Sequence, residues 1–377
     1  MVTPVPAIRI PETFKQSDGR FGVGPSKVRR EQVDALAKRW SDYLGTSHRQ
    51  APVKQQVARV RSGLRELFEL PDDYAVVLGN GGTTAFWDVA IFSLIRERSQ
   101  HLSFGEFGAK FAKSAGAAPF LAASSVLASD PGDIPTWLPE PGIDLYAAPH
   151  NETSTGVSMP VRRVHGADED SITLWDATSA AGGLAVAADQ FDVYYFAPQK
   201  CFGSDGGIWA ALMSAKALTR VDQIKASGRY IPAFLDLQTA VENSAKDQTY
   251  NTPSLATLFL MAEQVDWFNE QGGMSFTTDR TAKSADILYS WAEKSHYATP
   301  YVKDTDNRSH VVGAIDFADG VDAAVVAAVL RANGIVDTEP YRKLGRNQLR
   351  ISMFPAIEPA DVDALTSSID YVVKSLV

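Results

Sequence analysis

The sequence is poor in cysteine: Cys201 is the only one in 377 residues, so no disulfide can form within the chain. The formal net charge of −9 argues against broad binding to nucleic acid or to an anionic membrane. No apolar run approaches the roughly 18 residues that span a bilayer, and the first residues lack the basic and apolar segments of a secretory signal. Metal-ligand spacings such as HExxH or paired CxxC are also missing. These absences predict a cytoplasmic protein with no metal, nucleic-acid or membrane partner.

The composition is that of an ordinary globular protein, with 45% hydrophobic and 21% charged residues. A chain of 377 residues is long enough for two domains. We expect a proline-rich N-terminal arm over 1–20, a large domain over 21–270 and a small C-terminal domain over 271–377. The "GGM" stretch at 272–274 marks the expected boundary.

Hydrophobic periodicity predicts an α/β fold for the large domain. Apolar residues recur at helical spacing over 31–43 and 53–68, and an apolar helix follows the "GNGG" turn as far as Ile95. Strands are predicted at 74–78, 145–149, 172–177, 194–198 and 208–214. Several are apolar on both faces, as in a largely parallel sheet covered by helices. The C-terminal part reads as α+β, with strands at 311–317 and 349–354 and helices near 321–333 and from Pro359.

Polar residues follow the ends of these strands, where open α/β sheets bind ligands. "GNGGTT" (79–84) can present N–H and O–H donors to a phosphate at a helix N-terminus, although a plain structural turn explains it equally well. Asp176 ends one strand, where an aspartate is as often a helix cap as a functional carboxylate. Lys200 follows another strand, and lysine is rarely buried without a partner. Together the three features suit pyridoxal 5′-phosphate (PLP), with Lys200 bonding its aldehyde, Asp176 keeping its ring nitrogen protonated and the glycine turn holding its phosphate.

The sequence also resembles a known family, the phosphoserine aminotransferases, within the class V, fold-type I PLP enzymes. The matching segments span residues 21 to 355: "FGVGPSKV", "GTSHRQAPV", "LGNGGTTAFWD", "HNETSTGV", "WDATSAAGG", "YYFAPQKCFGSDGG", "YNTPS" and "NGIVDTEPYRKLGRNQLRISMFP". The similarity is greatest to the actinobacterial branch. It implies a mostly parallel seven-stranded sheet covered by helices, a smaller C-terminal α+β domain, and one PLP per subunit of a homodimer.

The resemblance also implies roles for individual residues. Lys200 would be the Schiff-base lysine and Asp176 the partner of the ring nitrogen. The other residues implied in cofactor binding are Gly82, Thr83 and Gln199 for the phosphate, Phe107 stacking on the ring, Thr153 at the phenolic oxygen, and Asn251 and Thr252 reaching the phosphate of the other subunit. Arg350 would hold the substrate α-carboxylate, and His48 with Arg49 its phosphate or distal carboxylate.

Some positions depart from the family pattern. Many members carry arginine after the glycine turn, where Thr83 and Thr84 stand here, and Phe107 replaces the commoner tryptophan. Many also carry His-Arg shortly before the late arginine, where this chain has "KLGRNQ". Nearby cations that could compensate are Arg342, Lys343 and Arg346.

The activity implied is transamination between L-glutamate and 3-phosphohydroxypyruvate in L-serine synthesis, with a related phosphorylated keto acid of vitamin B6 synthesis as a further candidate substrate. An alternative is another class V aminotransferase, such as one using alanine or serine with glyoxylate, and a second is a non-catalytic PLP-binding protein. Cys201 lies beside Lys200, which suggests a cysteine desulfurase as another possibility. The nucleophilic cysteine of that chemistry, however, must lie on a mobile loop, separate from the Schiff-base lysine. Neighbours on an extended strand face opposite sides, so we expect Cys201 to be a packing residue.

Overall fold

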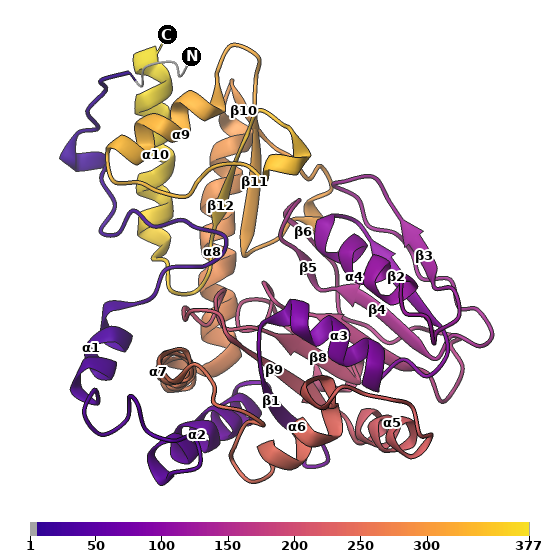
Figure 1. Cartoon of the computed structure of the whole chain (residues 1–377). Coiled ribbons are helices and arrows are strands. Elements are labelled where there is room, and N and C mark those ends of the chain that lie inside the picture. The colour runs from indigo at the N-terminus through magenta and orange to yellow at the C-terminus, as the bar shows by residue number, and fades with distance from the viewer. Residues whose placement is uncertain (1–5, 377) are drawn as a thin grey trace.

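The computed structural model describes residues 6–376, which form a large sheet, a small sheet and a two-stranded hairpin (Figure 1). The large sheet has seven strands in the order β1-β9-β8-β7-β4-β2-β3. Its strands are β1 Ala75–Asn80, β2 Ser99–Ser103, β3 Ser125–Ala128, β4 Leu145–Pro149, β7 Ile172–Asp176, β8 Val193–Phe196 and β9 Ile208–Met213. Only β9 runs against its two neighbours, so the predicted mostly parallel seven-stranded sheet is confirmed.

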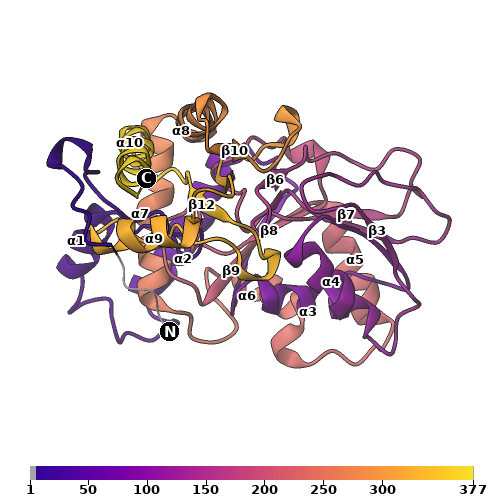
Figure 2. The same cartoon turned by 90° about the horizontal axis from the view of Figure 1, so that it is seen from above.

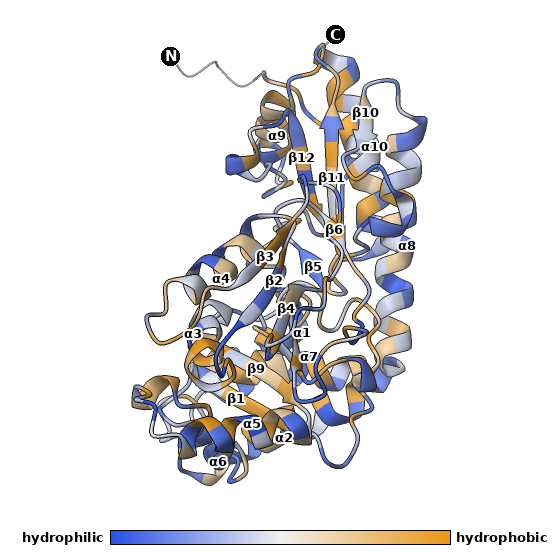
Figure 3. Ribbon diagram, turned by 90° about the vertical axis from the view of Figure 1, so that its right-hand side faces the viewer, coloured by the Kyte–Doolittle hydropathy of each residue, from blue (hydrophilic) through white to orange (hydrophobic). Residues whose placement is uncertain are grey.

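Helices cover both faces of the large sheet. Alternate strand residues point to opposite faces, so Tyr194 packs with α2 and α7 while Tyr195 packs with α3 to α6. Hydrophobic residues are prominent in β1 and β9, whereas β2 is largely hydrophilic (Figure 3). The helices of this part are α1 Arg30–Lys38, α2 Ala51–Leu67, α3 Thr83–Ser93, α4 Glu106–Gly116, α5 Ala215–Ala226, α6 Leu237–Ser244 and α7 Leu255–Gln271, with short 3-10 turns η2 Ala188–Gln190 and η3 Ala233–Leu235.

The C-terminal part is a three-stranded antiparallel sheet packed against helices (Figures 1 and 2). Its elements are α8 Gly273–Lys294, β10 Ala298–Pro300, η4 Thr305–Asn307, β11 Val312–Phe317, α9 Ala323–Ala332, η5 Arg342–Leu344, β12 Gln348–Ser352 and α10 Pro359–Leu376. Gly272 and Gly273 adopt positive φ between α7 and α8, so "GGM" does interrupt the helical chain.

The N-terminal segment packs against this C-terminal part rather than standing apart. It contains η1 Glu12–Phe14, and Ile10 and Phe21 join the same apolar cluster as α8 to α10. The first five residues of the predicted arm lie outside the described residues. No helix within residues 6–376 is both long and apolar enough to cross a bilayer.

The site-forming loops lie at the carboxyl ends of the parallel strands. Asp176 is the last residue of β7, and Lys200 lies in the turn after β8, the neighbouring strand. A short hairpin, β5 Asn151–Glu152 with β6 Val157–Ser158, follows β4 and carries Thr153. The sheet order therefore brings together segments that are far apart in the sequence.

A buried ion pair stabilises the opposite end of the large domain. Arg220 of α5 and Asp144, just before β4, are 3% and 2% exposed, and Nη1 lies 3.0 Å from Oδ1. Asp144 also accepts backbone N–H groups of the loop before β2, from residues 96, 97 and 98. Removing the arginine would leave a buried carboxylate without its cation.

We predict that Arg220→Ala lowers the free energy of unfolding by about 3–5 kcal/mol, the usual cost of breaking a buried pair. The matched control is Arg96→Ala, which removes an exposed pair with Asp170 and should cost less than about 1 kcal/mol. Urea unfolding of the two variants measures both costs, and equal values would contradict the assignment.

Candidate active site

The Lys200 amine is held against the backbone of the N-terminal segment. Its Nζ donates a hydrogen bond to the carbonyl of Val23. Burial, followed by the positive charge of Arg350, lowers the pKa of Lys200 to about 8. A far larger share of this amine than of an ordinary lysine is therefore neutral near physiological pH, and the neutral amine is the form that attacks a carbonyl or accepts a proton.

Gly24 provides the space for this amine. A Cβ built at Gly24 would lie 1.9 Å from Lys200 Nζ, and the φ of +156° is one that other residues rarely adopt. Its place within "FGVGPSKV" predicts no role for this glycine, because only the tertiary contact reveals one.

Asp176 is fixed in orientation by donors from three elements. Its Oδ1 accepts the backbone N–H of Thr178 at 3.0 Å, and its Oδ2 accepts Tyr195 Oη at 3.0 Å and Trp87 Nε1 at 3.2 Å. Asp176 and Phe107 line the same small cavity under the N-terminal turn of α4. Asp176, the predicted partner of the ring nitrogen, and Phe107, the predicted stacking residue, thus face the same cavity.

Thr153 and Arg350 are joined across the two parts of the chain. Arg350 of β12 donates through Nη1 to the carbonyl of Thr153 at 3.0 Å, and its guanidinium lies 5.2 Å from the Tyr341 ring. Burial lowers the pKa of Arg350, although it remains a cation. The Thr153 hydroxyl donates to Ser179 at 2.8 Å, and Asn151 donates to the same oxygen.

A buried carboxylate, Glu152, connects the Thr153 loop to α4. Its oxygens accept the backbone N–H groups of Phe107 at 3.0 Å and Gly108 at 3.1 Å, and the hydroxyl of Ser154 at 2.7 Å. Burial raises the pKa of Glu152, while these hydrogen bonds oppose the shift. The ring of Phe107 and the Thr153 loop are therefore held by one side chain that the sequence reading did not assign.

The glycine turn begins α3. Gly82 is the N-cap and Thr83 the first helical residue, and a Cβ at Gly82 would meet open space. The first amides of a helix have no partner within it and carry the positive end of its dipole. Gln199 adds a side-chain oxygen, Oε1, that is buried and without a hydrogen-bond partner among the described residues. Arg350 Nε is likewise buried and has no hydrogen-bond partner among the described residues. A cofactor with a flat ring, a phosphate and polar substituents fits this set of groups.

The predicted residues of the other subunit's site form a separate exposed group. Asn251 and Thr252 are exposed, and their carbonyls accept the side-chain amide of Asn80 at 3.1 and 3.0 Å. Thr252 Oγ1 lies 3.0 Å from His48 Nδ1, and Arg49 next to it is exposed. Burial, followed by the charge of Arg49, lowers the pKa of His48. His48 and Arg49 are thus grouped with Asn251 and Thr252 rather than with the Lys200 amine.

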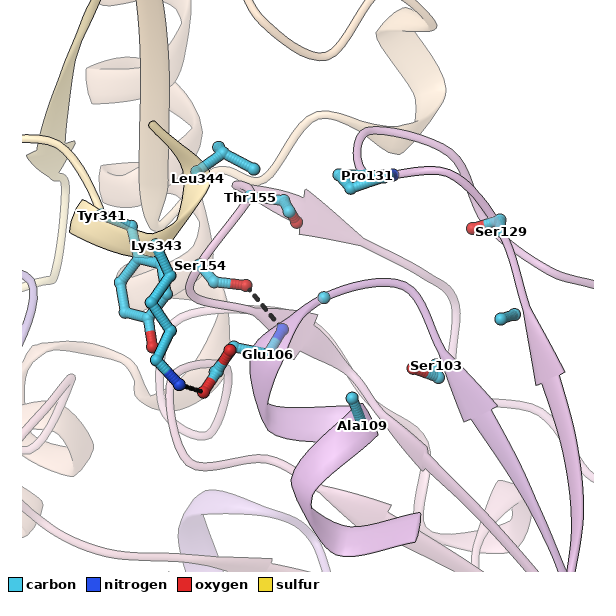
Figure 4. Close-up of a pocket in the computed structure, with 12 residues that line it drawn as sticks. Ser103, Glu106, Ala109, Ser129, Pro131, Ser154, Thr155, Tyr341, Lys343 and Leu344 are labelled. Atoms are coloured by element: carbon cyan, nitrogen blue, oxygen red, sulfur yellow. Dashed lines mark hydrogen bonds and ion pairs between the residues drawn. The ribbon is translucent and has the colours of Figure 1, made fainter. Parts of the chain in front are cut away.

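The three candidate compensating cations take different positions. Lys343 of η5 forms an ion pair with Glu106 of α4. This pair lies at one wall of a cavity of about 290 Å³ between the two parts of the chain (Figure 4). Arg342 is exposed on the same turn. Arg346 instead binds Asp316 through Nε at 3.1 Å and lines a separate hollow with Lys303 and His296, so we do not place it in the substrate site.

Cys201 is fully buried in the core, and its thiol lies 3.5 Å from the carbonyl of Ser179. Burial raises its pKa far above the ordinary thiol value. It lies in a turn rather than on the extended strand assumed in the sequence reading. A fully buried, protonated thiol in the core does not suit desulfurase chemistry.

We predict that Gly24→Ala weakens PLP binding by about tenfold, because the added methyl would take the place of the Lys200 amine and the tip of that side chain would have to move. Gly116→Ala is the matched control, since a Cβ there meets nothing within 4 Å. Fluorescence titration of the cofactor-free variants measures the two affinities. Equal affinities would show that the position of the amine does not depend on Gly24.

Comparison with known proteins gives a consistent picture. Residues 128–365 match the family model for class-V aminotransferases. A phosphoserine aminotransferase of Nocardioides sp. is 64% identical over 371 residues, covering 98% of this chain and 99% of that protein. The crystal structure of a phosphoserine aminotransferase from Cytophaga hutchinsonii superposes with a TM-score of 0.85 at 21% identity, covering 94% of this chain and 99% of that one. The PLP-bound enzyme of Trichomonas vaginalis has a TM-score of 0.81 at 18% identity, covering 94% of this chain and 99% of that one. The chain belongs to the phosphoserine aminotransferase family of class-V aminotransferases.

Proposed function

We propose that this protein transfers the amino group of L-glutamate to 3-phosphohydroxypyruvate, giving 2-oxoglutarate and O-phospho-L-serine for L-serine synthesis. The cofactor is PLP, one per subunit. The observation that carries the proposal is that two cations meet the loops of the site in a chain of this family: the Lys200 amine binds the carbonyl of Val23, and the half-buried Arg350 binds the carbonyl of Thr153. We also propose that it acts in the cytoplasm, and that 21–270 and 271–377 form its two domains with residues 6–20 packed on the second.

The residues of the site suit PLP in the following roles. The first turn of α3, with Gly82 and Thr83, and the side-chain N–H groups of Gln199 would hold the phosphate. Phe107 would cover one face of the ring, Thr153 would reach the phenolic oxygen, and Asp176 would accept the ring N–H. When bound, PLP supplies an electron sink that makes the α-proton of an amino acid removable, and it carries the amino group from one substrate to the other.

The chain itself supplies substrate orientation and proton transfer. Arg350 binds the α-carboxylate through its planar guanidinium, ideally with two parallel hydrogen bonds. The Lys200 amine accepts the α-proton and returns it, because a pKa of about 8 keeps both of its protonation states available near neutral pH. Both half-reactions use the same pocket, so the cations for the distal group must accept either a carboxylate or a phosphate.

We further propose that His48 and Arg49 serve the site of the partner subunit in a homodimer. The support is their grouping with Thr252, through the contact between His48 and Thr252 Oγ1 at 3.0 Å. Asn251 and Thr252 are exposed in the single chain, so they are available to a second copy. A distal anion would then be bound by one subunit and the α-carboxylate by the other.

The function is tested by comparing amino acceptors. We predict that kcat/KM with glutamate is higher for 3-phosphohydroxypyruvate than for hydroxypyruvate or glyoxylate by about 30- to several-thousand-fold, the usual worth of a buried charge-assisted contact. Lys200→Ala should lose all turnover and keep its fold. The phosphorylated keto acid of vitamin B6 synthesis belongs in the same panel. A preference for glyoxylate would instead identify an alanine- or serine-glyoxylate aminotransferase, and PLP binding without turnover would identify a carrier.

The shared-site arrangement is tested by subunit complementation. Lys200→Ala mixed with an Asn251→Ala/Thr252→Ala double variant should regain about one working site per heterodimer, because each chain supplies what the other lacks. Arg49→Ala mixed with Lys200→Ala should behave in the same way. As the control, Arg350→Ala mixed with Lys200→Ala should remain inactive, since both changes affect the same half of each site. Activity from a monomer in sedimentation experiments would rule the arrangement out.

A further inference from the structure

The aspartate at the end of β7 receives hydrogen bonds on both oxygens. Thr178 binds Oδ1 through its backbone N–H and its hydroxyl, while Tyr195 and Trp87 both donate to Oδ2. These donors come from the loop after β7, from β8 and from α3. Rotation of the carboxylate would break contacts with all three, so its orientation is set before any cofactor arrives.

Tyr195 is placed to act on Asp176 and on little else that is polar. It is fully buried, and its ring stacks on Phe86 with centroids 4.4 Å apart. Burial, followed by the negative charge of Asp176, raises the pKa of Tyr195 well above its ordinary value. The phenol therefore stays protonated and remains a hydrogen-bond donor across the working pH range.

Trp87 ties the same carboxylate to the phosphate turn. It lies one turn after Thr83 on α3, so a single helix carries the proposed phosphate-binding amides at its start and a donor to Asp176 near its middle. Its ring also stacks near Phe111 of α4, with centroids 6.1 Å apart. Because Phe111 and Phe107 both line the cavity that Asp176 also lines, Trp87 links the carboxylate to the α4 wall of that cavity.

We propose that Tyr195 and Trp87 are positioning residues that fix Asp176 Oδ2 for the ring nitrogen of the cofactor. The inference rests on the proposed function, because it gives these two aromatic residues a task in that same site. Hydrogen bonds to an anion stabilise it and fix the plane of its carboxylate group, and the charged ring N–H would share Oδ2 with these two neutral donors. A neutral phenol and an indole do this without adding a charge that would compete with the ring for the carboxylate.

The chain offers a matched pair of variants. Tyr195→Phe removes only the hydroxyl that binds Asp176 and keeps the stacked ring. Tyr194→Phe removes the hydroxyl of the adjacent tyrosine, which is equally buried but points to the other face of β8 and contacts His150 Nδ1 at 3.0 Å. Trp87→Phe gives a second, independent test of the same carboxylate.

We expect Tyr195→Phe to bind PLP about 10-fold more weakly and to lower kcat about 10-fold, with KM for glutamate within about twofold of the wild type. Tyr194→Phe should stay within about twofold of the wild type in PLP affinity, in kcat and in KM for glutamate. Both variants should retain cooperative thermal unfolding. In an Asp176→Asn background, Tyr195→Phe should have less than about twofold further effect on PLP affinity, because the acceptor it serves is already altered.

The inference is overturned if Tyr195→Phe matches Tyr194→Phe, or if its effect on PLP affinity persists in full in the Asp176→Asn background. A KM rise with unchanged kcat would equally contradict it, because that pattern indicates lost substrate binding. Failure of the proposed function would appear differently, as a wild-type protein that does not bind PLP or transfer amino groups.

Discussion

The buried amine of Lys200 is the constraint on which the rest of the site depends. An ammonium ion is costly to bury, and here the neighbouring guanidinium of Arg350 raises that cost further. The pKa of the Lys200 amine is accordingly lowered to about 8, and the amine donates a hydrogen bond to the backbone carbonyl of Val23. The N-terminal segment must therefore pass across the carboxyl end of the sheet, and it does so with a glycine at the point of closest approach.

The same arrangement explains how the two parts of the chain cooperate. Arg350 comes from the small C-terminal sheet, yet it donates to the carbonyl of Thr153 in the large one. Lys343 forms a second link, to Glu106 at the start of α4. These contacts place Arg350, the cation that we propose for the substrate α-carboxylate, where its charge acts on the lysine amine. A change in the relative position of the two parts would alter the pKa of the amine and the substrate-binding site together.

The sequence predicted the strands that are apolar on both faces, because their pattern needs no tertiary information. The predicted strand at 145–149 matches β4, and the one at 172–177 ends one residue beyond β7. The strand β2, "SQHLS", was not predicted, since its buried polar residues find partners only in the folded chain: Ser99 Oγ lies 2.9 Å from His101 Nε2, and Gln100 donates to Glu140, outside the strand. The roles of Gly24, Glu152 and Tyr195 were likewise missed, because a glycine, a loop acid and a strand aromatic acquire them only through contacts with distant segments. The grouping of His48 with Thr252 became apparent only in three dimensions for the same reason.

The central claim is that Lys200 is the residue that bonds the cofactor. The most direct test is to incubate the purified protein with PLP, reduce it with borohydride and identify the modified lysine by peptide mass spectrometry. The account predicts stoichiometric labelling of Lys200 that disappears in Lys200→Ala and falls sharply in Gly24→Ala. Labelling of a different lysine, or undiminished labelling after the loss of Lys200, would contradict it.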